Sequence, residues 1–225
     1  MNVLDILFPK NCLGCGKGGG YICGRCLTKV SFATTCCPVC TRFSFYGKTH
    51  SACKSDLSLD GVVSLWEHKG VIKNAISQVK YKFAYDVVSD VVANAAIEVN
   101  KFKLSGNIQC AAVPLHRQRE NWRGFNQSER FAEEVSRALG WQYVPSLLVR
   151  TKHTEAQVHL HKKKRLRNIR GKIAVNTDVF DKIDVKNPLI IVDDVWTTGA
   201  TLKECGRVLK QKGIKEVWGL TIAKA

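Results

Sequence analysis

The residues with the clearest chemical content lie near the C-terminus, between Pro188 and Leu202. An apolar run at positions 189–192 ends in two carboxylates, and a loop of threonine and glycine then leads toward a helical segment. Backbone N–H groups at a helix N-terminus, together with hydroxyl groups, form a site for a phosphate monoester. Two adjacent carboxylates can accept hydrogen bonds from vicinal ribose hydroxyls or bind Mg²⁺. The predicted phosphate and ribose site therefore consists of Asp193, Asp194, Thr197, Thr198, Gly199, Ala200 and Thr201.

Cysteine spacing indicates a metal-binding module at the other end of the chain. Eight of the ten cysteines lie between Cys12 and Cys53, mostly in pairs separated by two residues. Two such pairs complete a closed tetrahedral zinc site, whereas redox dithiols of this spacing occur singly in thioredoxin-like units. The predicted ligands of two structural zinc ions are Cys12, Cys15, Cys23, Cys26, Cys37, Cys40, His50 and Cys53. Sequential and interleaved pairing both fit the spacing, and either Cys36 or its neighbour could be the ligand.

Composition limits the kind of protein and the kind of partner. The chain has 225 residues, 45% of them apolar, and a formal net charge of +16. No apolar run approaches the roughly 18 residues of a membrane span, and the first residues lack the pattern of a signal peptide, so we expect a cytoplasmic protein. Seven thiolates and two zinc ions lower the charge by only about three. We expect nucleic acid or another polyphosphate as partner; a basic surface without a dedicated partner is the alternative.

Two regions of unequal size must position these residues. Residues 1–58 form the zinc-binding part, and residues 59–225 alternate apolar strands with amphipathic helices, which predicts a parallel α/β sheet. We expect strands at 62–66, 108–113, 147–149, 189–192 and 216–222, and helices at 71–81, 86–102, 127–139 and 200–212. Thr151–Arg170 is a long, polar and basic segment of the kind that serves a function or moves. Cys110 and Cys205 stand in apolar surroundings and are expected in the core.

The 188–202 segment resembles the phosphoribosyl pyrophosphate signature of the type I phosphoribosyltransferases. Further motifs narrow the resemblance to the competence protein F family, which also carries an N-terminal zinc domain. These motifs are Val-Pro-Leu-His-x-x-Arg at 113–119, Arg-Gly-Phe-Asn-Gln at 123–127 and Gln-x-x-Leu-x4-Arg-x-x-Asn-x-x-Gly at 157–171. The resemblance implies a type I phosphoribosyltransferase fold with a flexible hood, behind a double zinc ribbon.

The resemblance also implies roles for individual residues. It assigns the pyrophosphate loop and hood to Pro114, Leu115, His116, Arg117, Arg119, Arg123, Gln157, Arg165 and Asn168. Hood closure would exclude water from an oxocarbenium-like transition state. The basic residues of the hood segment fit nucleic acid equally well, namely Lys162, Lys163, Lys164, Arg165 and Arg167. Asn126 has a second interpretation, as the cap of the following helix.

Two functions follow from the resemblance. In the first, the protein binds phosphoribosyl pyrophosphate with Mg²⁺ and handles single-stranded DNA during natural transformation, with DNA-uptake and recombination proteins as partners, some at the inner face of the membrane. In the second, it transfers a phosphoribosyl group to a nitrogen nucleophile. Thr197 stands where purine-salvage members carry an acid, so the acceptor is unidentified.

Four aromatic residues lie near basic residues in the sequence and are suited either to base stacking or to core packing, namely Tyr81, Phe83, Trp122 and Phe125. The sequence shows no helix-turn-helix pattern of the kind that would favour a transcriptional regulator.

Overall fold

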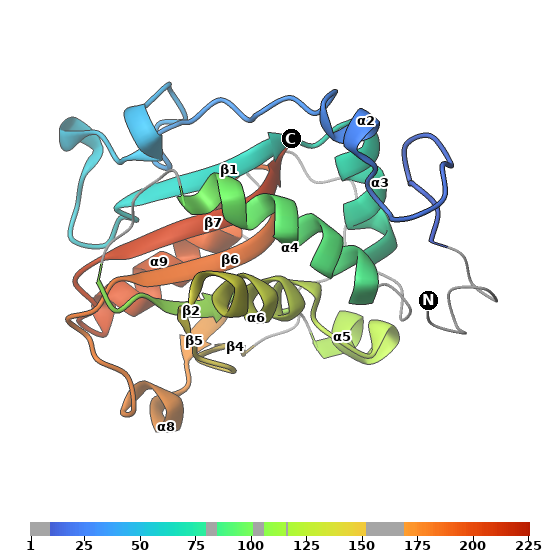
Figure 1. The fold of residues 1–225 in the computed structure, drawn as a ribbon. Helices are drawn as coiled ribbons and strands as arrows, with labels where there is room; N and C mark the ends of the chain where they lie inside the picture. The colour runs from blue at the N-terminus through green and yellow to red at the C-terminus, as the bar shows by residue number, and fades with distance from the viewer. Residues whose placement is uncertain (1–9, 80–84, 101–105, 116, 152–168) are drawn as a thin grey trace.

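The fold is built around a parallel sheet (Figure 1). A computed structural model describes residues 10–79, 85–100, 106–115, 117–151 and 169–225. The five sheet strands are β1 (Gly61–Glu67), β2 (Gln109–Ala112), β3 (Gln142–Tyr143), β6 (Leu189–Trp196) and β7 (Val217–Lys224). They run in the order β1-β7-β6-β2-β3, and all four pairings are parallel. The α/β class expected from the alternating pattern is confirmed.

Both faces of the sheet are buried, as the continuous apolar strands require. Ile190 and Val192 face one cluster of side chains, whereas Leu189 and Ile191 face the other. The first face packs on α3 (Gly70–Val79), α4 (Tyr85–Asn100) and α6 (Gln127–Leu139). The second packs on α9 (Ala200–Gln211) and on the antiparallel pair β4 (Leu148–Arg150) and β5 (Ile173–Val175). Figure 1 shows α4 and α6 in front of the sheet and α9 behind it. The short helices α5 (Arg117–Arg123) and α8 (Thr177–Phe180) complete this part.

The strand order creates a switch point between β2 and β6. From β2 the chain passes through α6 outward to the edge strand β3, whereas from β6 it passes through α9 to β7 in the opposite direction. In open parallel sheets, ligands bind in the crevice beyond the carboxyl ends of the two strands where the direction reverses. β6 also overhangs β2, because its pairing with β2 stops at Val192 while its pairing with β7 continues to Trp196. The overhang exposes the next residues of β6 toward the crevice.

The cysteine-rich segment lies along the outer edge of β1 (Figure 1). It contains α2 (Gly24–Leu27) and the 3₁₀ turns η1 (Phe45–Gly47) and η2 (Ser51–Cys53). Antiparallel bridges join Phe32 to Trp66 and Lys48 to Gly61, at the two ends of β1. The segment therefore covers a sheet edge that would otherwise offer unpaired backbone groups. A boundary near residue 58 stays a prediction, because the cysteine-rich segment also contributes side chains to the core of the larger part.

Most predicted elements are present within two or three residues of their expected ends. The ends of the helices expected at 71–81 and 86–102 fall partly outside the described residues. The loop expected after β2 contains α5, which has no apolar stripe in its sequence and so gives no helical period. β3 has two residues and β5 three, too few for a strand pattern. Cys110 and Cys205 are fully buried, as expected. No helix within the described ranges has the length and hydropathy of a membrane span.

Candidate functional site

A cavity of about 360 Å³ opens at the switch point between β2 and β6. Its volume lies in the roughly 300–1,000 Å³ range of small-molecule sites. Seven of the residues singled out in the sequence line it: Pro114, Leu115, Arg123, Asp193, Asp194, Thr197 and Thr201. The structure therefore brings together the acidic strand end, the loop after β2 and the start of α9, three segments that are far apart in the chain.

Asp193 lines this cavity with a carboxyl group whose pKa is strongly shifted. Its Oδ1 accepts hydrogen bonds from the Ser128 hydroxyl at 2.9 Å and from the backbone N–H of Asp194 at 2.9 Å. Burial, followed by the neighbouring Asp194 carboxylate, raises the pKa of Asp193 to about 7. Two adjacent carboxyl groups in a partly dry site cannot both ionise cheaply. Asp193 is therefore partly protonated near neutral pH.

A chain of side chains from α5 and α6 holds Asp194 in place. Arg123 Nη1 donates to Gln127 Oε1 at 2.8 Å, and Gln127 Nε2 donates to Asp194 Oδ2 at 3.4 Å. Asn126 accepts a hydrogen bond from the N–H of Ser128 at 3.0 Å, so it caps α6. Its Nδ2 also donates to the carbonyl of Val113 at 3.0 Å. The Arg-Gly-Phe-Asn-Gln motif thus orients the acidic pair and fixes the loop after β2, with Asn126 acting as cap rather than lining the cavity.

The loop between β6 and α9 depends on one glycine. Gly199 precedes α9 in the left-handed region, with φ of 68°. A Cβ atom there would lie 2.1 Å from the ring of Trp196. Glycine is thus required both by backbone conformation and by the close approach of the indole. The Thr198 hydroxyl accepts a hydrogen bond from the N–H of Ala200 at 3.3 Å. The N-terminal turn of α9 consequently opens toward the cavity, and Thr197 and Thr201 line it.

The cavity also contains residues that the sequence did not single out. His68 follows β1, Ser128 belongs to the first turn of α6, and Arg150 ends β4. His68 directly follows a strand and Arg150 is the last residue of one. Their position at the carboxyl end of a strand is the sequence feature by which they could have been predicted. Ser128 carries no such signal, because its role depends on the approach of α6 to β6.

Several predicted site residues lie outside the described residues. They are His116, Gln157, Lys162, Lys163, Lys164, Arg165, Arg167 and Asn168. Arg117 and Arg119 lie in α5, and their side chains are not described. The two ends of the expected hood do lie close together, because the N–H of Thr151 donates to the carbonyl of Lys172 at 3.0 Å. Glu204 of α9 fixes one end by accepting from the N–H of Gly171 at 2.7 Å. The hood remains a prediction.

The cysteine-rich segment forms two compact clusters of metal-ligating groups. In each, four ligand atoms lie within 4.8 Å of one another. The first contains Cys12, Cys15, Cys23 and Cys26, and the second contains Cys37, Cys40, His50 and Cys53. All eight predicted ligands are included and the pairing is sequential, which the spacing alone left open. The buried Cys36 belongs to neither cluster.

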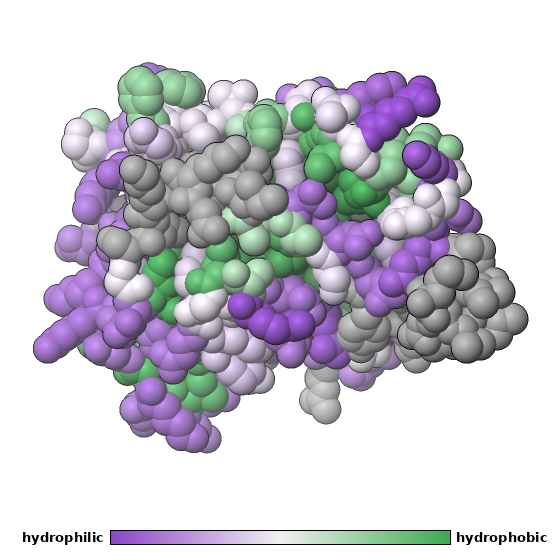
Figure 2. Space-filling view, viewed as in Figure 1, coloured by the Kyte–Doolittle hydropathy of each residue, from purple (hydrophilic) through white to green (hydrophobic). Residues whose placement is uncertain are grey.

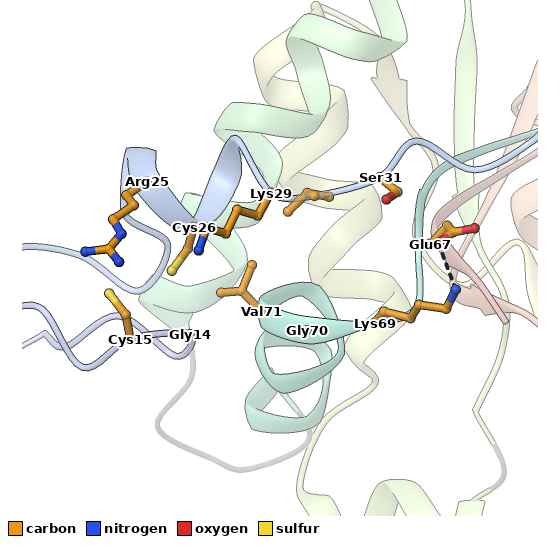
Figure 3. A pocket seen from close by; sticks show the side chains of 11 residues that line it. Gly14, Cys15, Arg25, Cys26, Lys29, Ser31, Glu67, Lys69, Gly70 and Val71 are labelled. Atoms are coloured by element: carbon orange, nitrogen blue, oxygen red, sulfur yellow. Dashed lines mark hydrogen bonds and ion pairs between the residues drawn. The ribbon is translucent and has the colours of Figure 1, made fainter.

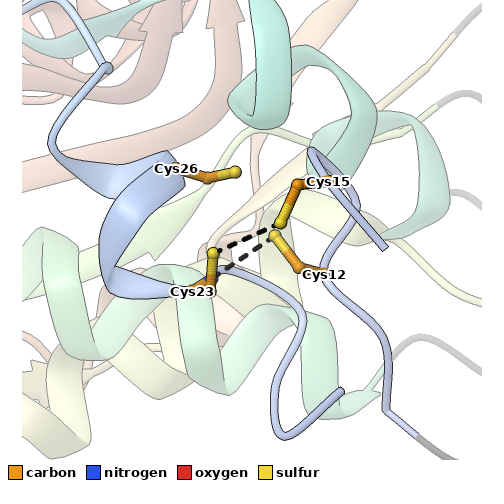
Figure 4. Close-up of side chains that lie close together, drawn as sticks. All are labelled: Cys12, Cys15, Cys23 and Cys26. Carbon is orange, nitrogen blue, oxygen red and sulfur yellow. Dashed lines mark hydrogen bonds between the residues drawn. The ribbon is translucent and has the colours of Figure 1, made fainter. Parts of the chain in front are cut away.

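The first cluster fits a zinc site with four cysteine ligands (Figure 4). A zinc ion with four thiolates at about 2.3 Å places its sulfur atoms roughly 3.8 Å apart. The Sγ atoms of Cys15 and Cys23 lie 3.6 Å apart. Burial alone would raise the pKa of Cys12, but the N–H groups of Cys23 and Gly14, among others, lower it to about 6. Backbone donors thus stabilise a thiolate before any metal binds.

The second cluster has a defined histidine orientation. His50 Nδ1 lies 3.4 Å from Cys40 Sγ, and Nε2 lies 3.0 Å from the carbonyl oxygen of Phe43. Nε2 therefore carries the proton and donates it, which leaves Nδ1 as the metal ligand. Such an outer hydrogen bond is usual for zinc-bound histidine. Both clusters support structural zinc, and four ligands each leave no open position for catalysis.

A second cavity, of about 370 Å³, lies between the first cluster and the start of α3 (Figure 3). Arg25, Lys29 and Lys69 line it, and Lys69 Nζ donates to Glu67 at 3.0 Å. A zinc ion with four thiolates carries a net charge of about −2. Lys69 thus has an acidic partner, and Arg25 and Lys29 would offset the charge of a zinc ion held by the first cluster.

Comparisons with known proteins agree with both parts of the chain. Residues 3–55 match the model of the double zinc ribbon domain. Competence protein F of Haemophilus influenzae is 26% identical over 96% of this chain and 98% of its own length. The DNA utilization protein YhgH of Escherichia coli is 27% identical over 88% of this chain and 89% of its own. Competence protein ComFC of Bacillus subtilis is 24% identical over 85% and 79%, respectively.

Solved structures give weaker similarities. A hypoxanthine phosphoribosyltransferase from Staphylococcus aureus has a TM-score of 0.38 at 10% identity, covering 61% of this chain and 62% of its own. A glutamine phosphoribosylpyrophosphate amidotransferase from Bacillus subtilis has a TM-score of 0.41 at 15% identity, covering 65% and 30%. These scores are too low to decide the fold, which rests on strand order and register. With relatives aligned along nearly its whole length and a double zinc ribbon at its start, this chain is similar to proteins of the competence protein F family.

Proposed function

We propose that the cavity at the switch point binds phosphoribosyl pyrophosphate with Mg²⁺. One observation carries the proposal: Asp193 and Asp194 lie beside the cavity at the overhanging end of β6, directly before the Thr197–Thr201 turn of α9. The turn offers N–H and hydroxyl groups to the 5′-phosphate, and the acids face the position of a ribose. The loop after β2 lies opposite, on the side where a pyrophosphate would extend.

The residues present fit this ligand in charge as well as in position. The pair of carboxyl groups suits a hard cation such as Mg²⁺, which prefers oxygen ligands and would neutralise part of the pyrophosphate charge. Arg123 and Arg150 line the same cavity and add positive charge to it. Asp193 must release its proton on binding, because its pKa of about 7 leaves it partly protonated at neutral pH.

The protein as a whole is proposed to handle single-stranded DNA during DNA uptake. The relatives are named for competence and for DNA utilization, and the net charge of +16 favours a polyanionic partner. The proposal includes DNA-uptake and recombination proteins as further partners and the cytoplasm as the compartment. In this interpretation the nucleotide site acts as a sensor or as a grip on a nucleotide end.

Phosphoribosyl transfer to a nitrogen nucleophile is the second candidate. The intact acidic pair and threonine turn favour it, since they provide the groups needed to hold the donor substrate. Thr197 is exposed at the position where an acid would handle a base proton. Neither the nucleophile nor its general base is therefore defined by the described residues.

Calorimetric titration tests the binding site. Wild-type protein should bind phosphoribosyl pyrophosphate in the presence of Mg²⁺, and the double substitution Asp193→Asn and Asp194→Asn should weaken binding at least about tenfold. Asp178→Asn, in an exposed position on α8, is the matched control. Unchanged binding in the double variant refutes the site. A pyrophosphate-release assay with and without single-stranded DNA then separates the two functions, since release requires a transferase.

A further inference from the structure

Three large aromatic side chains of the second zinc module are exposed. Phe43 is 58% exposed, Phe45 75% and Tyr46 63%. The rings of Phe43 and Phe45 meet edge to face, with centroids 5.1 Å apart. Figure 2 shows hydrophobic side chains at the margin of the molecule over the region where Figure 1 places this module. We refer to Phe43, Phe45 and Tyr46 together as the aromatic surface.

The backbone beneath the aromatic surface is fixed from inside. Ser44, between the two phenylalanines, is 5% exposed, and its hydroxyl donates to the carbonyl of Lys48 at 2.5 Å. The Thr35 hydroxyl donates to the carbonyl of Ser44 at 2.7 Å. Gly47 lies so close to β1 that a Cβ atom would be 1.9 Å from the Val62 carbonyl oxygen. The inward contacts of Ser44 and Gly47 leave the aromatic rings facing outward.

Tyr46 has a backbone conformation that tyrosine rarely adopts. Its φ is 54°, in the left-handed region. This conformation is unfavourable for a bulky residue, and such strain is concentrated at functional positions. Here it accompanies an aromatic ring that is mostly exposed. Core packing therefore does not explain these three residues.

The second zinc site supports the same backbone. His50 Nε2 donates to the carbonyl of Phe43, while Nδ1 of the same ring faces the metal cluster. The Cys36↔Phe43 bridge adds a further backbone connection within the module. A zinc ion held by His50 would therefore also fix the position of Phe43, and the contacts of His50 and Ser44 preorganise the aromatic surface.

The charge of the module identifies the kind of ligand. Residues 10–59 contain seven lysines and arginines and one acid, a net of +6, while the thiolates and two zinc ions contribute −3, leaving about +3. Arg42 precedes Phe43, and Lys48 follows the η1 turn. A cationic surface with exposed aromatic rings favours a polyanion that carries planar groups over an uncharged apolar partner.

We propose that the aromatic surface binds single-stranded nucleic acid, with bases stacked on Phe43, Phe45 and Tyr46 and phosphates near Arg42 and Lys48. This inference rests on the proposed role in handling single-stranded DNA and names the surface that performs it. A double helix does not offer the faces of its bases, so the surface discriminates against duplex DNA. Stacking requires no particular base, because every base has a π-face, so binding is independent of sequence.

Fluorescence anisotropy with a labelled oligothymidine of about 15 nucleotides tests the proposal. The variant combines Phe43→Ala and Phe45→Ala with Tyr46→Asn, since asparagine tolerates the left-handed backbone. Loss of each stacked ring should cost at least about fivefold in affinity, so the triple variant should bind at least about a hundredfold more weakly. Phe32→Ala removes a ring that is 60% exposed at the opposite end of β1 from the aromatic surface, and should leave affinity unchanged.

Two further readouts separate stacking from charge. The triple variant should keep the wild-type slope of log affinity against log salt, whereas Arg42→Ala should lower that slope by up to about 0.7. With an abasic strand of equal length, wild type and triple variant should bind equally. Zinc content of two ions and unchanged phosphoribosyl pyrophosphate binding confirm that the variant is folded.

The possible failures are distinguishable. If wild-type protein does not bind the single strand, the proposed DNA function fails and this inference fails with it. If wild type binds and the triple variant binds equally well, only the assignment of the surface is overturned, and a protein contact becomes the explanation for the exposed rings. An equal loss in Phe32→Ala would also overturn it, because stacking would then not be specific to Phe43, Phe45 and Tyr46.

Discussion

Replacing Asp193 by asparagine should make the folded protein increasingly more stable than wild type as the pH rises, while removing its ability to hold Mg²⁺. Asp193 lies partly buried beside Asp194, and burial, followed by that neighbouring charge, raises its pKa to about 7. Asparagine is neutral at every pH, and its Oδ1 can accept the same hydrogen bonds from Ser128 and from the Asp194 N–H. The substitution thus removes an unfavourable charge without emptying the position.

The sign follows from proton linkage. The folded protein holds the Asp193 proton up to about pH 7, whereas the unfolded chain releases it near the ordinary value of 3.8. Between these values the folded state binds more protons, so the free energy of unfolding falls as the pH rises. The full effect corresponds to about 4 kcal/mol, of which about 2.6 kcal/mol falls between pH 5 and pH 8. Because the side chain is partly accessible to solvent, we halve this figure to about 1.3 kcal/mol.

Urea unfolding at pH 5 and pH 8 measures the effect as a difference between proteins. The advantage of Asp193→Asn over wild type should grow by about 1.3 kcal/mol between the two pH values. Contributions from the zinc thiolates and histidines cancel in this difference, because both proteins share them. Asp178→Asn, an exposed carboxyl on α8, should show no such growth. A constant difference between Asp193→Asn and wild type would refute the assignment of a raised pKa.

Three further predictions concern the scaffold. Gly199→Ala should lower the free energy of unfolding by about 2–4 kcal/mol in urea, because φ is positive there and the added Cβ would collide with the Trp196 ring. Gly213→Ala is the control, since φ is 99° but no atom lies within 4 Å of the added Cβ, and it should cost only about 1–2 kcal/mol. Metal analysis should find two zinc ions in Cys36→Ser but only one in Cys37→Ser, because only Cys37 belongs to the second cluster. Loss of a zinc ion from Cys36→Ser would contradict this assignment of ligands. Lys210 Nζ lies 2.6 Å from Asp60 Oδ2 in a largely buried pair. Lys210→Ala should destabilise the protein by about 3 kcal/mol in the same urea assay, and adding Asp60→Asn should recover part of that loss.

The parallel sheet was predictable because its strands are buried on both faces. The run at 189–192 has no polar residue to interrupt it, and its alternate residues contact the two separate core clusters. The end of β6 was less predictable, since the strand continues through both acids to Trp196. Pairing with β7 maintains the strand there, and the local sequence Asp-Asp-Val-Trp does not predict this long-range pairing.

The site was predictable in its residue types but not in its arrangement. Adjacent acids before a threonine turn indicate a phosphate and ribose site from spacing alone. The raised pKa of Asp193, in contrast, depends on burial and on the approach of Asp194, and its orientation depends on Ser128 from a helix 65 residues earlier. Likewise, cysteine spacing predicted the eight residues that form the two clusters, but their sequential grouping depends on the path of the chain between the cysteine pairs. Exposure of Phe43 and Phe45 was not predictable, because the same residues could have formed a small core.

The aromatic surface and the nucleotide cavity are both attached to β1, at its opposite ends. Lys48 pairs with Gly61 at the start of the strand, and His68 lines the cavity just beyond its end. The extended chain between these points spans about 23 Å. A single strand can therefore occupy the aromatic surface without entering the cavity, and saturating Mg²⁺ and phosphoribosyl pyrophosphate should leave the affinity for oligothymidine unchanged. Anisotropy titrations with and without the nucleotide measure this directly. Competition between the two ligands would mean instead that the end of the DNA strand occupies the cavity, and that the separation along β1 does not keep the two sites independent.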